Sequence, residues 1–170
     1  METQQLIKNK FERSEKALTL KPAIGLGKKV SVTKLINGLS CEIREGNWVV
    51  KTDMPEQVGG NSSAPTPGVY GRAALGSCLA SGYMMWASKL NIPIDSLEIQ
   101  IEADFDDAGT FGTSDVFPGY SEVRYHVKIK SSVSSQEIKT FLDKADKHSP
   151  YLDVFSRAQP CVRTIEIVND

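Results

Sequence analysis

The sequence has neither an excess of charge of one sign nor a long apolar run. Twenty Lys and Arg residues are balanced by 21 Asp and Glu residues, which leaves a net charge of −1. Surfaces that bind nucleic acid or anionic membranes carry clustered basic residues, so we expect neither partner. The most apolar stretch, residues 68–90, is interrupted by Arg72 and Lys89, which a membrane-spanning helix would not tolerate.

Cysteine and histidine are also scarce. An odd number of widely separated cysteines argues against a disulfide framework, and the histidines show no spacing typical of zinc ligands. The residues concerned are Cys41, Cys78, Cys161, His126 and His148. We therefore expect no metal and no cofactor, and the cysteines are left for thiol chemistry or for packing.

The acidic loop 104–119 resembles a calcium loop only in part. Acidic residues fall at loop positions 1, 3 and 12, but Ala108 occupies position 5 and Asp115 replaces the bidentate glutamate. A solvated hairpin loop is the favoured interpretation. The N-terminus has no apolar secretory core, so we expect the chain to begin near Met1 and to work in a reducing cytoplasm.

The length of 170 residues suits one domain. Residues 3–18 carry apolar side chains at helical spacing among many charges, which predicts a peripheral amphipathic helix. We therefore divide the chain into an N-terminal helical extension, residues 1–28, and a single domain, residues 29–170.

Several segments have the composition of strands. Residues 29–53 contain three short β-prone runs separated by turn sequences, which predicts a three-stranded meander. Residues 96–105 and 122–130 alternate apolar and polar side chains, which is typical of a half-buried antiparallel pair. The run CVRTIEIV, residues 161–168, predicts a closing strand.

Helices are predicted between these strands. The Gly, Pro and Ser-rich loop 54–68 ends at Thr66, a candidate N-cap, and Pro67 suits the first position of a helix that runs to about Leu90. Ser134 and Glu137 have the spacing of a capping box, so a second helix begins there. This order of elements predicts an α+β fold with a mostly antiparallel sheet.

Cys78 lies within the long predicted helix and allows two interpretations. Its helix face carries small and apolar residues, which predicts contact with another helix, for which the same helix of a partner subunit is a candidate: Gly71, Ala74, Leu75, Gly82 and Met85. The local sequence favours a packing role, because Cys78 lies three turns from the helix start and has no cation on its own face. A reactive thiol requires a cation from another element.

His148, Ser149 and Pro150 suggest a histidine-activated serine nucleophile. Neighbours in sequence seldom have the required geometry, and no nucleophile elbow is present. We therefore predict that Ser149 caps a short helical turn that runs to Phe155.

Two longer runs resemble signatures of a known family. The run GGNSSAPTPGVYGRAALGSCLASGYMMWA, residues 59–87, resembles the central signature of the OsmC/Ohr family, and KADKHSPYLDVFSRAQPCVRTIEIV, residues 144–168, resembles its second signature. The resemblance covers roughly residues 29–168. It implies an OsmC-like α+β fold, an intertwined homodimer around the long helices, and reduction of hydroperoxides by a pair of cysteines.

The resemblance implies roles for individual residues. Cys78 takes the position of the cysteine that attacks the peroxide, and Arg44 of the predicted meander is the candidate for the catalytic arginine. Tyr70 and Met85 of the long helix are the candidates for substrate binding. Two positions depart from the family: its second cysteine falls on Ser149, and its loop glutamate falls on Gly68.

Three functional hypotheses remain. In the first, which we favour, Cys78 reduces a hydroperoxide and is resolved by an external thiol or by Cys161. In the second, the site binds a small apolar or thiol-reactive ligand without turnover. In the third, Cys78 only packs the core of a structural dimer.

Overall fold

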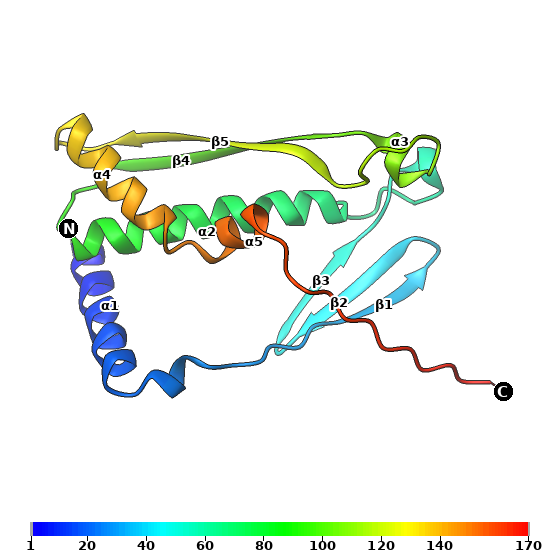
Figure 1. Ribbon diagram of the computed structural model, residues 1–170, viewed down its shortest axis with the longest axis horizontal. Coiled ribbons are helices and arrows are strands. Elements are labelled where there is room, and N and C mark those ends of the chain that lie inside the picture. The colour runs from blue at the N-terminus through cyan, green and yellow to red at the C-terminus, as the bar shows by residue number, and fades with distance from the viewer. Residues whose placement is uncertain (1, 170) are drawn as a thin grey trace.

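The computed structural model describes residues 2–169. Its centre is a long helix, α2 (Pro67–Lys89), which lies beneath a long two-stranded antiparallel sheet (Figure 1). That sheet consists of β4 (Ser96–Phe105) and β5 (Tyr120–Lys130). Helices and antiparallel strands occur in the predicted order, so the α+β fold class is confirmed.

The core is built on one face of α2. Leu75, Leu79, Tyr83 and Ala87 are at most 2% exposed, and they recur every four residues, once per helical turn. Apolar residues of β4 and β5 alternate with exposed polar ones and pack against this face. The alternation in the sequence therefore orients the sheet as predicted.

Two short helices complete the core. The helix α4 (Ser135–Asp146) begins at the predicted capping box of Ser134 and Glu137, and it buries Phe141 and Ala145 against α2. The helix α5 (Pro150–Ser156) follows directly. At the end of α4, the Asp146 carboxylate accepts hydrogen bonds from the hydroxyls of Tyr83 (2.6 Å) and Tyr125 (2.8 Å), which ties α2, α4 and β5 together.

The N-terminal helix α1 (Glu2–Leu20) is confirmed where residues 3–18 predicted it, and the 3₁₀ turn η1 (Pro22–Gly25) follows it. The Gln4 side chain donates to the carbonyl of Ile92 (2.9 Å) and accepts from the amide of Ile94 (3.3 Å). Phe11 packs edge-on against Trp86, with ring centroids 5.2 Å apart. The helix α1 is thus attached at the carboxyl end of α2.

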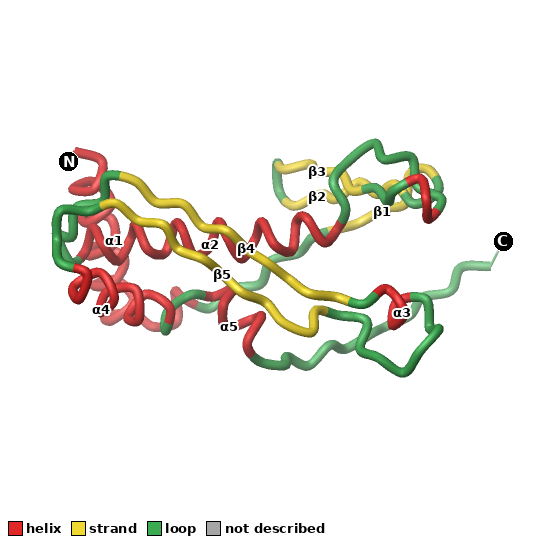
Figure 2. The backbone as a smooth tube through the Cα atoms, turned by 90° about the horizontal axis from the view of Figure 1, so that it is seen from above, coloured by secondary structure: helices red, strands yellow, loops and turns green. Residues whose placement is uncertain are grey.

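The predicted meander is also present. It consists of β1 (Val32–Asn37), β2 (Ser40–Glu45) and β3 (Trp48–Thr52), paired antiparallel in that order. Gly38 and Gly46 have φ of +54° and +55°, the left-handed conformation that its tight turns require. The meander forms a separate sheet beside the amino end of α2 (Figures 1 and 2), and most of its residues are exposed.

One buried carboxylate holds the loop between β3 and α2, which includes the 3₁₀ turn η2 (Glu56–Val58). Asp53 is fully buried and accepts hydrogen bonds from the amides of Met54, Asn61 and Ser63 at 2.8, 3.2 and 3.0 Å. The Ser63 hydroxyl donates a further bond of 2.6 Å. Together these bonds hold the pKa of Asp53 well below its usual value, and the bond from the Ser63 hydroxyl contributes most.

The prediction of a closing strand at residues 161–168 is wrong. Residues 157–169 have no regular secondary structure and are exposed; in the view of Figure 1 the chain runs past the meander and ends beyond it. A strand needs a neighbour for its backbone hydrogen bonds, and no described strand pairs with this segment. The acidic loop, by contrast, contains a single helical turn, α3 (Asp107–Thr110).

Candidate functional site

Cys78 and Ser149 lie side by side, although 71 residues separate them in the sequence. The Cys78 sulfur is 3.8 Å from the Ser149 hydroxyl oxygen. Cys78 is half-buried in the middle of α2, and Ser149 is 6% exposed at the N-cap of α5. The pair therefore joins the two segments that resemble family signatures.

The hydrogen bonds of Ser149 determine what it can offer to the sulfur. Its oxygen accepts from the amide of Leu152 at 3.4 Å, which confirms the predicted N-cap. A hydroxyl has one proton to donate and two lone pairs. Because the capping bond uses a lone pair, the proton remains available for donation to the Cys78 sulfur.

His148 does not form a nucleophilic pair with Ser149. Its ring stacks on Trp86, with centroids 4.8 Å apart and an interplanar angle of 20°. Over residues 2–169 no hydrogen bond joins the His148 ring to Ser149. The capping interpretation of this sequence is therefore the correct one.

A cavity of about 210 Å³ lies near the pair, although neither Cys78 nor Ser149 lines it. Leu152, whose amide caps onto Ser149, lines it, and so does Leu75, one helical turn before Cys78. The remaining walls come from β5 and α5 and combine apolar or aromatic residues with polar ones: Tyr120, Ser121, Glu122, Val123, Tyr125, Phe155 and Ser156. Such a cavity has room for a small group about one helical turn from the thiol.

The structure places two arginines of interest in different settings. Arg44, the predicted catalytic arginine, is exposed on β2 and binds the Glu42 carboxylate at 2.7 Å. Arg72 is half-buried on α2, where its Nη1 donates to the Tyr120 hydroxyl at 3.0 Å. The sequence pattern gave Arg72 no role, although its position four residues after Gly68 places both on one helix face.

The Arg72 guanidinium lies beside Gly68, the position at which the resemblance implies a glutamate. A Cβ atom on Gly68 would lie 3.3 Å from the Arg72 Nη1, 3.5 Å from the Tyr120 hydroxyl and 3.8 Å from the Thr66 hydroxyl. Thr66 occupies the N-cap of α2, but its side chain makes no capping hydrogen bond there. A guanidinium and two hydroxyls thus lie close to Gly68, and even a Cβ at this position would require Arg72 to move slightly.

The two candidate substrate-binding residues lie apart from one another. The Tyr70 hydroxyl donates to the carbonyl of Lys51 at 2.9 Å and so links α2 to the meander. Met85 is 44% exposed and lines a cleft of about 560 Å³ between α1, α2 and β4, with Ile7 and Leu97 on its other walls. Their role in binding stays a prediction.

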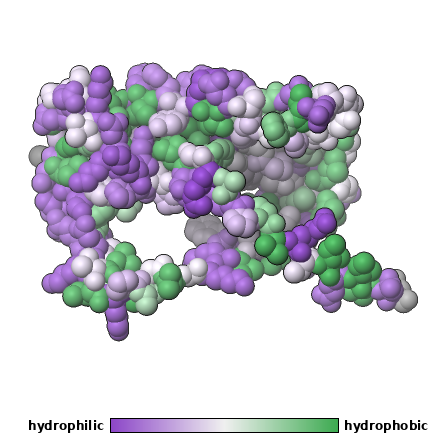
Figure 3. Space-filling view, in the orientation of Figure 1, coloured by the Kyte–Doolittle hydropathy of each residue, from purple (hydrophilic) through white to green (hydrophobic). Residues whose placement is uncertain are grey.

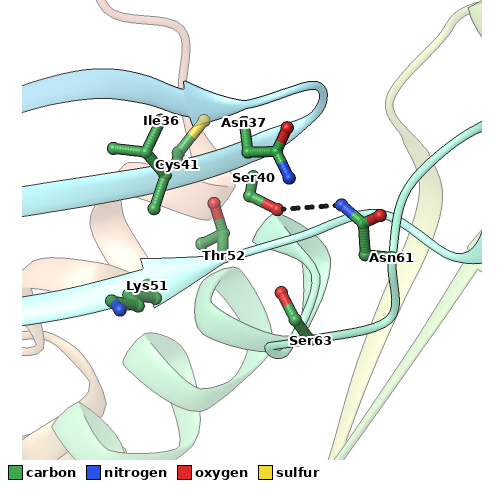
Figure 4. Close-up of a pocket in the computed structure, with 8 residues that line it drawn as sticks. All are labelled: Ile36, Asn37, Ser40, Cys41, Lys51, Thr52, Asn61 and Ser63. Carbon is green, nitrogen blue, oxygen red and sulfur yellow. Dashed lines mark hydrogen bonds between the residues drawn. The ribbon is translucent and has the colours of Figure 1, made fainter.

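The other two cysteines are free and lie in different parts of the molecule. Cys161 is exposed in the C-terminal segment. Cys41 lines a small pocket of about 290 Å³ in the meander (Figure 4), where the Asn61 amide donates to the Ser40 hydroxyl at 3.4 Å. Within residues 2–169, no group of three His, Cys, Asp or Glu side chains is placed to hold a metal ion, and no helix is long and apolar enough to cross a membrane.

Comparison with known proteins shows which family the chain resembles. The family model described as OsmC-like protein matches residues 59–164, which include both segments that form the site. The sequence has no match among curated proteins.

Solved structures share the fold at low sequence identity. An OsmC-like protein from Mycoplasma pneumoniae superposes with a TM-score of 0.65 at 21% identity, over 76% of this chain and 87% of that one. An organic hydroperoxide resistance protein from Legionella pneumophila gives 0.57 at 16% identity, over 77% and 90%. The organic hydroperoxide resistance protein OhrB of Bacillus subtilis gives 0.51 at 15% identity, over 76% and 91%.

Proposed function

The chain belongs to the OsmC-like protein family, and on that basis we propose that it is a thiol peroxidase in which Cys78 reduces a hydroperoxide and an external thiol restores the enzyme. The observation that carries the proposal is the 3.8 Å contact between the Cys78 sulfur and the Ser149 hydroxyl. Two structural relatives described as organic hydroperoxide resistance proteins support the substrate class.

The proposed reaction has three steps. The Cys78 thiolate attacks the terminal oxygen of R–O–O–H, the O–O bond breaks, and the products are a sulfenic acid on Cys78 and the alcohol R–OH after protonation. An external thiol then displaces water from the sulfenic acid and forms a mixed disulfide. A second external thiol releases Cys78, so that one hydroperoxide and two thiols give one alcohol, one water and one disulfide.

Ser149 has a direct part in this proposal. A hydroxyl cannot form a disulfide, so the step that a second cysteine performs is left to the external thiol. A hydroxyl can, however, donate a hydrogen bond to a thiolate, and hydrogen bonds to charged groups are about twice as strong as neutral ones. We infer that Ser149 stabilises the reacting form of Cys78.

We also propose that the protein acts as a homodimer. Large apolar side chains are exposed on the meander and on the C-terminal segment (Figure 3), among them Leu35, Trp48, Val49, Ile165 and Ile167. The spaces beside Gly71 and Gly82 of α2 are also open. A second copy would cover these surfaces and could bring Arg44 to a site; the roles of Arg44, Tyr70 and Met85 belong to this proposal.

A reducing cytoplasm is the proposed setting. The proposed reaction consumes external thiols, which such a compartment supplies. The three free cysteines are compatible with that environment.

The direct test is consumption of an organic hydroperoxide by the purified protein with a dithiol reductant. We expect turnover by the unaltered chain and by the double variant Cys41→Ser, Cys161→Ser, and none by Cys78→Ser. Equal turnover by Cys78→Ser and the unaltered chain would exclude the proposed nucleophile. Ligand binding without any peroxide consumption would instead support the non-catalytic hypothesis.

A further inference from the structure

We propose that Asp146 is a positioning residue, which holds the Ser149 hydroxyl against the Cys78 sulfur. Asp146 acts through the backbone that leads to Ser149, and two tyrosines from other elements hold Asp146 in turn. The position of Ser149 is a property of the folded chain alone. That this position also speeds the reaction of Cys78 with a hydroperoxide rests on the proposed function.

A hydrogen-bonded turn joins Asp146 to Ser149. The Ser149 amide donates to the Asp146 carbonyl at 3.1 Å, and the Ser149 carbonyl accepts from the Asp153 amide at 3.0 Å. Between the two residues, the His148 ring stacks on Trp86 of α2, with centroids 4.8 Å apart. Because both backbone polar groups of Ser149 are bonded and the turn is short, a displacement of Asp146 is passed on to the Ser149 hydroxyl.

Two tyrosines hold the Asp146 carboxylate from different directions. The Tyr83 hydroxyl of α2 donates to one oxygen at 2.6 Å, and the Tyr125 hydroxyl of β5 donates to the other at 2.8 Å. Tyr83 is 2% exposed, and Phe141 packs edge-on against its ring. Hydrogen bonds to a charged acceptor are about twice as strong as neutral ones. The carboxylate is therefore attached to groups that are themselves fixed in the core.

Both tyrosine hydroxyls keep their protons at neutral pH. Burial, followed by the hydrogen bond to Asp146, raises the pKa of Tyr125 to about 12. The same two causes raise the pKa of the more deeply buried Tyr83 well above its usual value. Each tyrosine thus remains a hydrogen-bond donor to the carboxylate.

These contacts form a closed ring that includes the thiol. From Cys78 the chain runs five residues along α2 to Tyr83, whose hydroxyl binds Asp146. The turn then leads to Ser149, whose oxygen lies 3.8 Å from the Cys78 sulfur. Five residues of helix keep Cys78 and Tyr83 about 7.5 Å apart along the axis. Every link in the ring is therefore helix backbone, a short turn or a hydrogen bond, which restricts the Ser149 hydroxyl relative to the sulfur.

The test measures how closely the two positions are held, without any peroxide. In a chain with Ser149→Cys, Cys41→Ser and Cys161→Ser, the only thiols are at positions 78 and 149. Equilibration with reduced and oxidised glutathione gives the ratio of disulfide to dithiol, and hence the effective concentration of one thiol at the other. We expect the tyrosine pair variant, Tyr83→Phe with Tyr125→Phe, to lower this effective concentration about tenfold or more, since it removes two hydrogen bonds to a charged group.

Further variants separate position from stability. The tyrosine pair variant removes only two hydroxyl oxygens and keeps the rings in the core. Asp146→Asn retains one acceptor oxygen and should keep part of the effective concentration, whereas Asp146→Ala retains none and should keep least. Asp53→Asn is the control for lost stability, because Asp53 bonds only to the loop before α2. It should lower the melting temperature and leave the effective concentration unchanged.

An effective concentration that stays the same in the tyrosine pair variant, or that falls as far in Asp53→Asn, would overturn the proposal. The link to the reaction has a separate measurement. With Ser149 present, the tyrosine pair variant should lower kcat/KM for an organic hydroperoxide, and in the Ser149→Ala background it should cause no further loss. An equal further loss there would show that the tyrosines do not act through Ser149.

The two measurements distinguish this proposal from the proposed function. A lower effective concentration in a protein that consumes no peroxide would keep the positioning role of Asp146 and refute the peroxidase. Peroxide turnover with an unchanged effective concentration would do the reverse.

Discussion

At the scale of single residues, the contact between Cys78 and Ser149 decides how the site is interpreted. The sequence predicted Ser149 as an N-cap from its position before Pro150, and this local prediction is confirmed. The contact with Cys78 is not local, since it depends on how α5 packs beside α2. Only the resemblance to a family linked the two positions before the structure did.

Arg72 shows the limit of the same reasoning. Its angular position on α2 separates it from Cys78, and the sequence offered no partner for it. The structure reveals Tyr120 as that partner, 48 residues further along the chain. Contacts of this kind arise from the packing of β5 on α2 and leave no pattern in the sequence.

Restoring a thiol at position 149 should restore intramolecular resolution. The Cys78 and Ser149 side-chain atoms are 3.8 Å apart, and a shift of about 2 Å would reach disulfide bonding distance. We expect Ser149→Cys, treated with one equivalent of hydroperoxide, to form a disulfide with Cys78 that peptide mass spectrometry detects. Ser149→Ala is the control, and it should stop at the sulfenic acid.

Failure of Ser149→Cys to form this disulfide, in a folded protein whose Cys78 is oxidised, would contradict the observed geometry. The Ser149→Ala control should itself be less stable than the unaltered protein. Loss of the cap of α5 should lower the free energy of unfolding by about 1 kcal/mol, as measured by urea denaturation.

At the scale of elements, the long helix was the best predicted part of the molecule. Thr66 and Pro67 predicted a helix from residue 67 to about residue 90, and α2 spans Pro67–Lys89. The capping box of α4 was equally informative because both of its hydrogen bonds are local. Cap and turn signals act within a few residues, which is why they can be recognised without the fold.

The loop before α2 was predicted only as a loop. Its order depends on Asp53, whose hydrogen bonds reach residues 54, 61 and 63. An aspartate in a Gly and Pro-rich stretch is ordinary, so the sequence did not distinguish this one. The structure shows that these hydrogen bonds hold the loop that leads into α2.

Replacing Asp53 by asparagine should loosen this loop. An amide cannot accept all four hydrogen bonds with a full negative charge, so Asp53→Asn should lower the melting temperature by several degrees at pH 7 and speed amide hydrogen exchange at residues 54–63. Glu56→Gln, which alters an exposed carboxylate of the same loop, is the control and should change little.

The stabilisation by Asp53 should decrease as the pH falls. The folded pKa of Asp53 is lowered from 3.8, so its stabilisation is complete above that value and is lost as the pH falls toward the folded pKa. The difference in melting temperature between the two proteins should therefore be constant above about pH 5 and shrink below about pH 4. A difference that grows on acidification would refute this account of the loop.

At the scale of the whole molecule, the predicted closing strand is the main failure. Residues 161–168 have the composition of a strand, yet no described strand pairs with them. Strand propensity expresses how well side chains fit a sheet, and it has no effect without a neighbouring strand. The meander and the C-terminal segment both expose apolar side chains. These are the surfaces that we propose a second copy covers.

A charge on the C-terminal segment should break the proposed dimer. Ile165→Lys should convert a dimer of two 18.6 kDa chains into a monomer in analytical ultracentrifugation. Thr164→Lys adds the same charge one residue earlier but replaces a polar side chain, so it removes no apolar contact and should leave the dimer intact. An unaltered protein that sediments as a folded monomer would refute the dimer outright.

The central claim is that Cys78 is a nucleophile toward hydroperoxides, and one measurement tests it most directly. The unaltered protein is treated with one equivalent of an organic hydroperoxide in the presence of dimedone, which captures sulfenic acids, and the labelled peptides are identified by mass spectrometry. The account predicts labelling at Cys78 ahead of Cys41 and of the more exposed Cys161. Labelling that follows exposure, with Cys161 modified first and Cys78 unmodified, would contradict it.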